Sequence, residues 1–114
     1  SLRLILPALR GLLKPGGHVV CLVKPQFEAG REKVGKKGVV REPGVHLEVL
    51  ERFLLHAAEA DFSVKGLTFS PIRGPEGNIE YLGYLSTGAG EAWCGDLAAL
   101  VAESHSTLEG GKHA

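Results

Sequence analysis

The chain has 114 residues, of which 44% are hydrophobic and 23% charged, a composition that suits one globular domain or part of one. Thirteen basic and thirteen acidic side chains cancel, so overall charge gives no reason to expect a polyanionic partner, and only local clustering can do so. Because no apolar run approaches the roughly 20 residues that cross a bilayer, the sequence predicts no membrane partner.

The first predicted element is a helix over residues 2–13, where leucine and isoleucine recur at helical spacing. Pro7 either kinks this helix or marks its start. Residues 14–17, Lys-Pro-Gly-Gly, end the helix, and the apolar run over residues 18–23 predicts a strand buried on both faces. Because the chain opens on Ser and enters the helix at once, we expect it to begin within a longer protein.

The remaining elements follow from turn residues and from periodicity. Residues 26–42 predict a long polar loop, and Glu42-Pro43-Gly44 predicts the start of a second helix, whose first turn tolerates proline. Residues 63–69 and 78–86 predict two more strands, separated by a turn-rich segment. Residues 92–103 predict a last helix, which a frayed tail follows.

The predicted order of helix, strand, helix, strand, strand and helix places the chain in the α/β class. The strand-helix-strand unit predicts parallel pairing of the first two strands. The short link between the last two strands predicts that they pair antiparallel or lie near each other. About three strands with flanking helices make a thin, mixed sheet, and its exposed edge calls for a partner, either the rest of a larger sheet or a second copy in a homo-oligomer.

Two charged residues beside the predicted strands are candidates for catalysis. Lys24 ends a buried strand, where open α/β sheets present their ligands, and a partly desolvated lysine can act as a base or as a polarising cation. Glu80 lies within an apolar predicted strand, so its carboxylate needs a polar cleft or an opposite charge. Each residue also has a plainer alternative, because Lys24 could simply reach water and Glu80 could face solvent from an edge strand.

A cluster of basic residues follows the first predicted strand. From Lys24 to Arg41 there are six basic residues and only two acidic ones, with glycines that let backbone approach a phosphate. Such a cluster beside a catalytic edge favours a polyanion such as RNA, although a solvated lysine-rich loop has the same composition. The candidate RNA contacts in this loop are Arg31, Lys33, Lys36, Lys37 and Arg41.

Two further features bear on ligands. Arg73 and Asn78 in the turn-rich segment could contact a phosphate or ribose, although turn chemistry alone explains most of that segment. The five histidines show no metal-ligand spacing, so no metal site is predicted. Cys21 and Cys94 stand far apart and give no disulfide framework, which favours a reducing, cytoplasmic setting.

Several motifs occur in a fixed order along roughly residues 1–86. They are residues 1–9, the run Leu-Val-Lys-Pro-Gln-Phe-Glu at 22–28, Gly30-Arg31 with residues 34–41, residues 70–75, and Gly-Asn-Ile-Glu at 77–80. In this combination the chain resembles the TlyA/hemolysin-A branch of the FtsJ-like methyltransferases. The resemblance implies a Rossmann-like fold that uses S-adenosylmethionine and methyl transfer to a ribose 2′-oxygen of ribosomal RNA. Residues 1–86 would be the C-terminal portion of the methyltransferase domain, and residues 87–114 a C-terminal extension.

Members of that family use a Lys-Asp-Lys-Glu catalytic set, in which Lys24 matches the second lysine by motif and Glu80 the glutamate. The first lysine, the aspartate and the glycine-rich turn for the methyl donor have no match here. The resemblance therefore implies that the donor site lies outside this chain and that the chain alone is inactive. Two alternatives stay open, namely a non-catalytic RNA-binding module and a membrane-active hemolysin.

Overall fold

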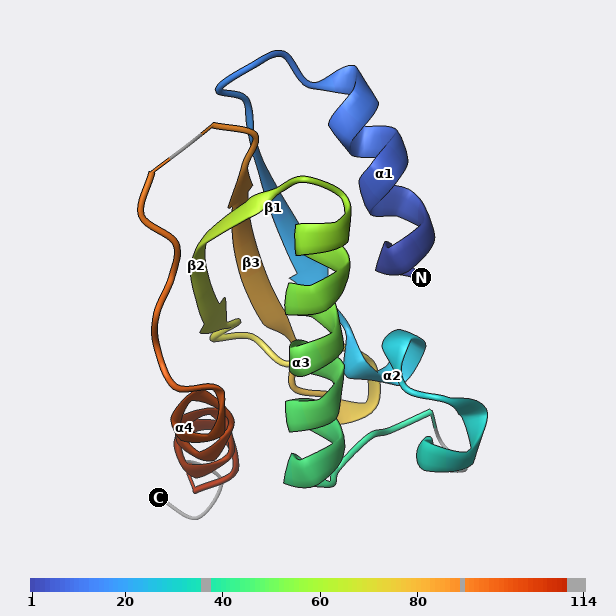
Figure 1. Cartoon of the computed structure of the whole chain (residues 1–114). Helices are drawn as coiled ribbons and strands as arrows, with labels where there is room; N and C mark the ends of the chain where they lie inside the picture. Colours follow the sequence, from blue (N-terminus) through green and yellow to red (C-terminus); the bar gives the residue numbers. More distant parts are fainter. Residues whose placement is uncertain (36–37, 89, 111–114) are drawn as a thin grey trace.

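A computed structural model describes residues 1–35, 38–88 and 90–110. Four α-helices, three strands and two short 3₁₀ helices are assigned in this part of the chain (Figure 1). In chain order they are α1 (Leu2–Leu12), β1 (His18–Val23), α2 (Pro25–Glu28), η1 (Arg31–Lys33), α3 (Pro43–Glu59), β2 (Ser63–Phe69), η2 (Pro75–Gly77), β3 (Tyr81–Ser86) and α4 (Leu97–Gly110).

The ends of α3 follow from local chemistry. The helix begins at Pro43, where the missing N–H is no loss because first-turn amides have no intrahelical acceptor. At its end Asp61 adopts a left-handed φ of 62°. Its N–H donates to the Ala58 carbonyl, and the Phe62 N–H donates to Ala57. This pair of bonds is a Schellman motif, which satisfies carbonyls at the helix end and turns the chain toward β2.

The strands form one sheet in the order β1-β3-β2, and β3 pairs antiparallel with both neighbours. The predicted antiparallel relation of the last two strands is confirmed, but the predicted parallel pairing of β1 and β2 is wrong. These two strands run in the same direction with β3 between them, so neither pairing in the sheet is parallel. Two apolar strands joined by a helix are compatible with either arrangement, and only the position taken by β3 decides between them.

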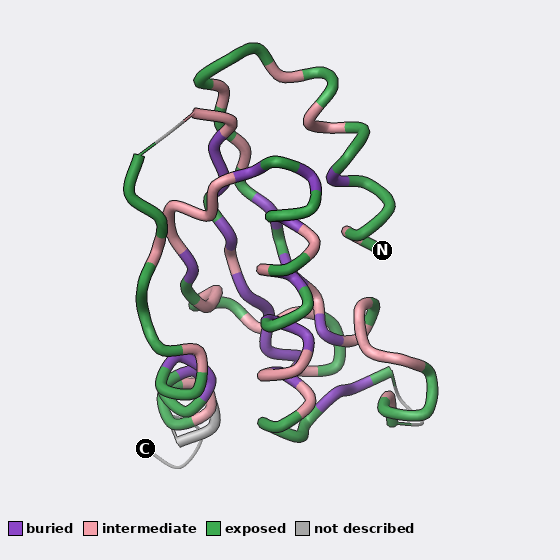
Figure 2. The backbone as a smooth tube through the Cα atoms, in the orientation of Figure 1, coloured by how far each residue is buried: buried purple, intermediate pink, exposed green. Residues whose placement is uncertain are grey.

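The hydrophobic core lies between one face of the sheet and α3, with α1 and α4 packed against α3 (Figure 2). Gly83 in the central strand lets α3 pack close to the sheet, because a Cβ at this position would lie 2.6 Å from a ring atom of Phe53. The other face is open, since Val20 is 64% exposed and Leu22 41% exposed. The expectation that β1 is buried on both faces is therefore wrong for the described part of the chain, where helices cover one face only.

Three predicted boundaries also need correction. The segment after β1 is not one loop, because α2 and η1 lie within it. β3 begins at Tyr81, so Asn78 and Glu80 precede the strand rather than lying in it. α4 begins at Leu97, where the Asp96 carboxylate accepts from the Ala98 and Ala99 amides, and it continues past the predicted end at residue 103 to Gly110.

Candidate catalytic rim

The sheet register brings Lys24 and Glu80 to the same rim. Val23 is the last residue of β1 and pairs with Tyr81, the first residue of β3. Lys24 follows Val23, and Glu80 precedes Tyr81, so the two residues extend adjacent strands at one end of the sheet. Among the described residues no ion pair joins the two side chains, because the Glu80 carboxylate binds Gln26 and the Lys24 ammonium lies over the Phe27 ring.

The carboxylate of Glu80 is enclosed by two other segments. Glu80 is 6% exposed, and its Oε2 accepts a hydrogen bond of 2.9 Å from Nε2 of Gln26. The Gly74 backbone lies against the same oxygen, so closely that a Cβ at position 74 would overlap it. The predicted need of this carboxylate for a polar neighbour is met by the Gln26 amide.

Lys24 lies between β1 and the one-turn helix α2, and its side chain is half-buried. Its Nζ lies 5.6 Å from the centre of the Phe27 ring, a distance at which an ammonium is attracted to an aromatic face. The lysine lines a shallow groove of about 260 Å³, most of whose walls are apolar. The other residues of this groove are Ser1, Leu2, Ile5, Leu22, Phe27 and Glu28.

Two buried polar atoms near this rim have no hydrogen-bond partner in the described structure. They are Oε1 of Gln26, whose nitrogen is bonded to Glu80, and Nη2 of Arg73, in the segment that leads to Glu80. The other terminal nitrogen of Arg73 donates to the Gly77 carbonyl at 3.4 Å. Buried polar groups are nearly always paired, so unpaired ones mark positions where a ligand or another segment can bind.

Asn78 faces inward rather than toward solvent. It is 2% exposed, its Nδ2 donates to the carbonyls of Gly38 and Pro75, and its Oδ1 accepts from the Val40 amide, each at 2.9 Å. All the hydrogen-bonding groups of this side chain are engaged within the protein. Asn78 was predicted to touch RNA, but its contacts assign it another task, which is to hold the base of the loop before α3 against the turn before β3.

A buried network that the sequence did not reveal holds the same loop from the other side. His46 is fully buried, and its Nε2 lies 2.8 Å from the Val40 carbonyl, which can only accept, so this nitrogen carries a proton. Its Nδ1 lies 3.1 Å from the Tyr81 hydroxyl and 2.9 Å from His105 of α4. The hydroxyl also lies 2.8 Å from Ser104. Burial raises the pKa of Tyr81 to about 12, against the opposing effect of the Ser104 hydrogen bond.

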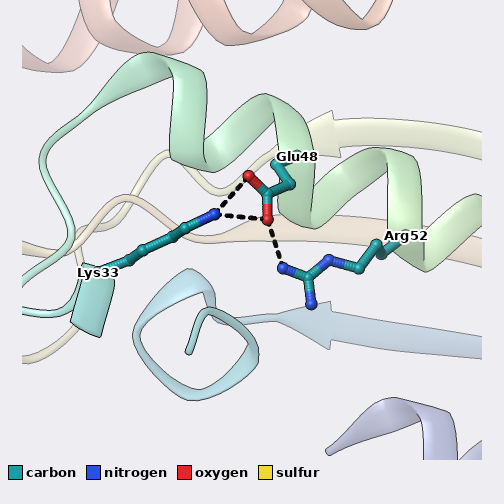
Figure 3. Close-up of polar contacts among 3 residues, drawn as sticks. All are labelled: Lys33, Glu48 and Arg52. Carbon is teal, nitrogen blue, oxygen red and sulfur yellow. Dashed lines mark hydrogen bonds and ion pairs between the residues drawn. The ribbon is translucent and has the colours of Figure 1, made fainter. Parts of the chain in front are cut away.

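The predicted RNA-contacting residues of the loop differ in how available they are. Lys33 donates to both carboxylate oxygens of Glu48 in α3, at 2.6 and 2.7 Å, and Arg52 also donates to Oε1 of that carboxylate (Figure 3). Hydrogen bonds from Lys33 and then Arg52 lower the pKa of Glu48. Much of the Lys33 charge is thus compensated, whereas Arg31 and Arg41 are exposed. Lys36 and Lys37 lie outside the described residues.

The family model described as FtsJ-like methyltransferase matches residues 1–87, the part that holds the whole sheet and the rim. The chain belongs to the FtsJ-like methyltransferase family. The family implies S-adenosylmethionine as the methyl donor. Three-quarters of the chain lies within the match, including Lys24, Gln26, Arg73 and Glu80.

Individual relatives agree with this assignment. The chain is 52% identical to "Putative rRNA methyltransferase YqxC" of Bacillus subtilis, over 96% of this chain and 41% of that protein. It is 40% identical to 16S/23S rRNA (cytidine-2'-O)-methyltransferase TlyA of Mycobacterium tuberculosis, over 76% of this chain and 32% of that protein. The chain thus spans well under half the length of these relatives.

A solved structure supports the fold. The structure named "Putative hemolysin from Streptococcus thermophilus" superposes with a TM-score of 0.88 at 47% identity, over all of this chain and 42% of that one. The match confirms the predicted α/β class with three strands and flanking helices. Within residues 1–35, 38–88 and 90–110, no helix combines the length and hydropathy that crossing a bilayer requires.

Proposed function

We propose that this chain is the C-terminal part of the catalytic domain of a ribosomal RNA ribose 2′-O-methyltransferase that acts in the cytoplasm. The observation that carries the proposal is the β1–β3 register, in which Lys24 directly follows β1 and Glu80 directly precedes β3 at one end of the sheet. The names of the relatives supply the substrate class, and the family match supplies the reaction class. Residues 1–86 would complete the domain, and residues 87–114 would extend it through α4.

The chemistry of the rim suits activation of a ribose hydroxyl. Such a hydroxyl is a poor nucleophile until its proton is removed or shared, and Lys24 at the mouth of an apolar groove could orient the oxygen or accept its proton. The Glu80 carboxylate, just before the adjacent strand, would position an ammonium group near the substrate. Displacement at a methyl carbon depends heavily on how the attacking oxygen, the carbon and the leaving group are aligned. A buried, hydrogen-bonded carboxylate is suited to holding the groups that set this alignment.

The methyl donor itself is S-adenosylmethionine, which would supply an electrophilic methyl group to the rim. The groove beside Lys24 does not fit this molecule alone, because it is shallow and its volume of about 260 Å³ is small for a ligand that must be largely enclosed. We therefore assign the donor site, with the remaining catalytic groups, to the part of the relatives that this chain does not span. The uncovered face and free edge of β1 are where that part would join the sheet, although a second copy of this chain could also pair there.

RNA would approach along the basic loop. Arg31 and Arg41 are exposed, and the base of the loop is fixed on both sides of Val40 by Asn78 and His46. Arg73 would add a guanidinium at the rim, Lys33 would contribute only after exchanging Glu48 for a phosphate, and Lys36 and Lys37 complete the proposed contact set. Because the chain is held at Val40, the neighbouring Arg41 loses little backbone entropy when it binds a phosphate.

The test uses the full-length protein with ribosomal RNA and S-adenosylmethionine that carries a labelled methyl group. Lys24→Ala and Glu80→Gln should each lower the rate of 2′-O-methylation by roughly 10²-fold or more, with the fold retained in circular dichroism. Lys14→Ala is the matched control, because Lys14 is an exposed lysine just before the opposite end of β1. Methylation at the wild-type rate by either rim variant would reject the assignment.

The basic loop also supports a simpler function, in which the protein binds RNA without methylating it. In that case wild-type protein would bind RNA with an affinity that falls steeply with salt, yet no methyl group would be transferred. The hemolysin names carried by some relatives give a further alternative, which release of dye from lipid vesicles by the purified protein would support.

A further inference from the structure

We propose that Gln26 is a positioning residue, which holds the Glu80 carboxylate in its working orientation through its side-chain amide. The inference rests on the proposed methyl transfer and adds to it a residue outside the lysine–glutamate pair. It starts from the hydrogen bond of 2.9 Å between Nε2 of Gln26 and Oε2 of Glu80, which joins α2 to the segment before β3. These residues are 54 positions apart in the sequence, so the contact exists only at the folded rim.

The helix that carries Gln26 is fixed at both ends. Pro25 begins α2 and is fully buried. At the other end the Glu28 carboxylate accepts from the Leu2 amide at 2.8 Å and from the Ser1 hydroxyl at 3.2 Å. A residue between two anchored neighbours has a well-defined backbone position, so its side chain can hold a partner in one place.

The backbone before η2 also restricts where the Glu80 carboxylate can lie. The backbone of Gly74 lies directly against the carboxylate, and a Cβ at this position would overlap Oε2. The φ of Gly74 is −79°, a value that any residue adopts, so it is the space taken by Glu80 rather than the backbone conformation that favours glycine here. Gln26 and Gly74 therefore act together as a clamp that restricts the carboxylate.

The orientation of the Gln26 amide follows from its partner. An ionised carboxylate only accepts, so the nitrogen must face Glu80, and Oε1 points elsewhere, buried and without a partner. Rotating the amide would satisfy neither group, because it would bring an oxygen against a carboxylate oxygen. The arrangement thus leaves one acceptor, Oε1, and one donor, Nη2 of Arg73, for groups that the bound substrate brings to the rim.

The test compares two substitutions in the full-length methyltransferase. Gln26→Glu keeps the shape of the side chain but can donate to Glu80 only while one of the two facing carboxyl groups is protonated. Its kcat relative to wild type should therefore be at least tenfold lower at pH 9 and should rise as the pH falls toward 6. Gln26→Ala cannot donate at any pH, so its ratio to wild type should be low and independent of pH. The KM for RNA should change little in both variants, because the carboxylate acts on the chemical step.

A second pair of variants tests the opposite side of the clamp. Gly74→Ala should lower kcat by displacing the carboxylate, whereas Gly44→Ala, whose added Cβ meets nothing within 4 Å, should leave it unchanged. The positioning role of Gln26 would be overturned if the kcat of Gln26→Glu relative to wild type did not change between pH 6 and pH 9, or if Gln26→Ala were fully active. If Glu80→Gln is inactive in that same assay, only the role of Gln26 has failed; if Glu80→Gln is fully active, the proposed catalytic rim has failed with it.

Discussion

Substitution of Gly83 tests the packing of α3 on the central strand. In the sheet Gly83 pairs with Cys21 on one side and Leu67 on the other, so the strand cannot shift to make room. A Cβ added to Gly83 would lie 2.6 and 2.7 Å from two ring atoms of Phe53, which is itself only 3% exposed. Overpacking of this kind costs roughly 1–3 kcal/mol, and we expect Gly83→Ala to lower the free energy of unfolding by about 2 kcal/mol.

Urea unfolding of the 114-residue chain, followed by circular dichroism, measures this change. Phe53→Leu should cost roughly 1–2 kcal/mol by itself because it leaves a cavity. The double variant Gly83→Ala/Phe53→Leu should lose less unfolding free energy than the sum of the two single variants, by about 1 kcal/mol or more. The shorter Leu side chain makes room for the new methyl group. Gly66→Ala is the matched control, because its Cβ would lie 3.6 Å from Tyr84, an ordinary contact. Strict additivity of the two changes, or a neutral Gly83→Ala, would refute the packing described here.

Two further predictions concern pH. The pKa of Tyr81 is raised from 10.0 to about 12 in the folded chain, so its contribution to stability is present below pH 10 and is lost as the pH rises through 12. Between pH 9 and pH 12 the loss is about 2 kcal/mol, because half of the folded chains still hold the proton at pH 12. The difference in unfolding free energy between wild type and Tyr81→Phe should shrink by that amount in urea titrations at these two pH values. The pKa of Glu48 is lowered, so its contribution is present above the ordinary carboxyl pKa and is lost as the pH falls through the folded value. The stability difference between wild type and Glu48→Gln should therefore be larger at pH 7 than at pH 3 and smaller in 1 M salt; a difference that ignores both pH and salt would contradict the ion pairs of Figure 3.

Part of the candidate site could be predicted from sequence because it depends on local order. Lys24 was placed just after a strand by the apolar run before it and by Pro25 after it, and β1 does end at Val23, as predicted. The sequence placed Glu80 inside a strand over residues 78–86, whereas β3 begins one residue after it, at Tyr81. The ordered motifs also indicated the family, which the match over residues 1–87 confirms.

The partners of these residues could not be predicted, because they come from distant parts of the chain. Gln26 meets Glu80 across 54 positions, His46 meets Tyr81 across 35, and Lys33 meets Glu48 across 15. Periodicity and turn residues describe the path of the chain over one or two turns, and they carry no information about such contacts. For the same reason Asn78 was predicted to contact RNA, although its side chain is buried and bonded to the loop before α3.

By itself, the sequence determined the elements whose signals are local: the strand at residues 63–69, the helix that begins at Pro43, and the motifs that identify the family. Tertiary structure alone decided that β3 lies between β1 and β2, and that one antiparallel register sets residues 24 and 80 at the same end of the sheet. The physical reason is that the backbone groups of a strand can form hydrogen bonds with any neighbouring strand. Strand order is therefore selected by the packing of the whole core rather than by any one segment.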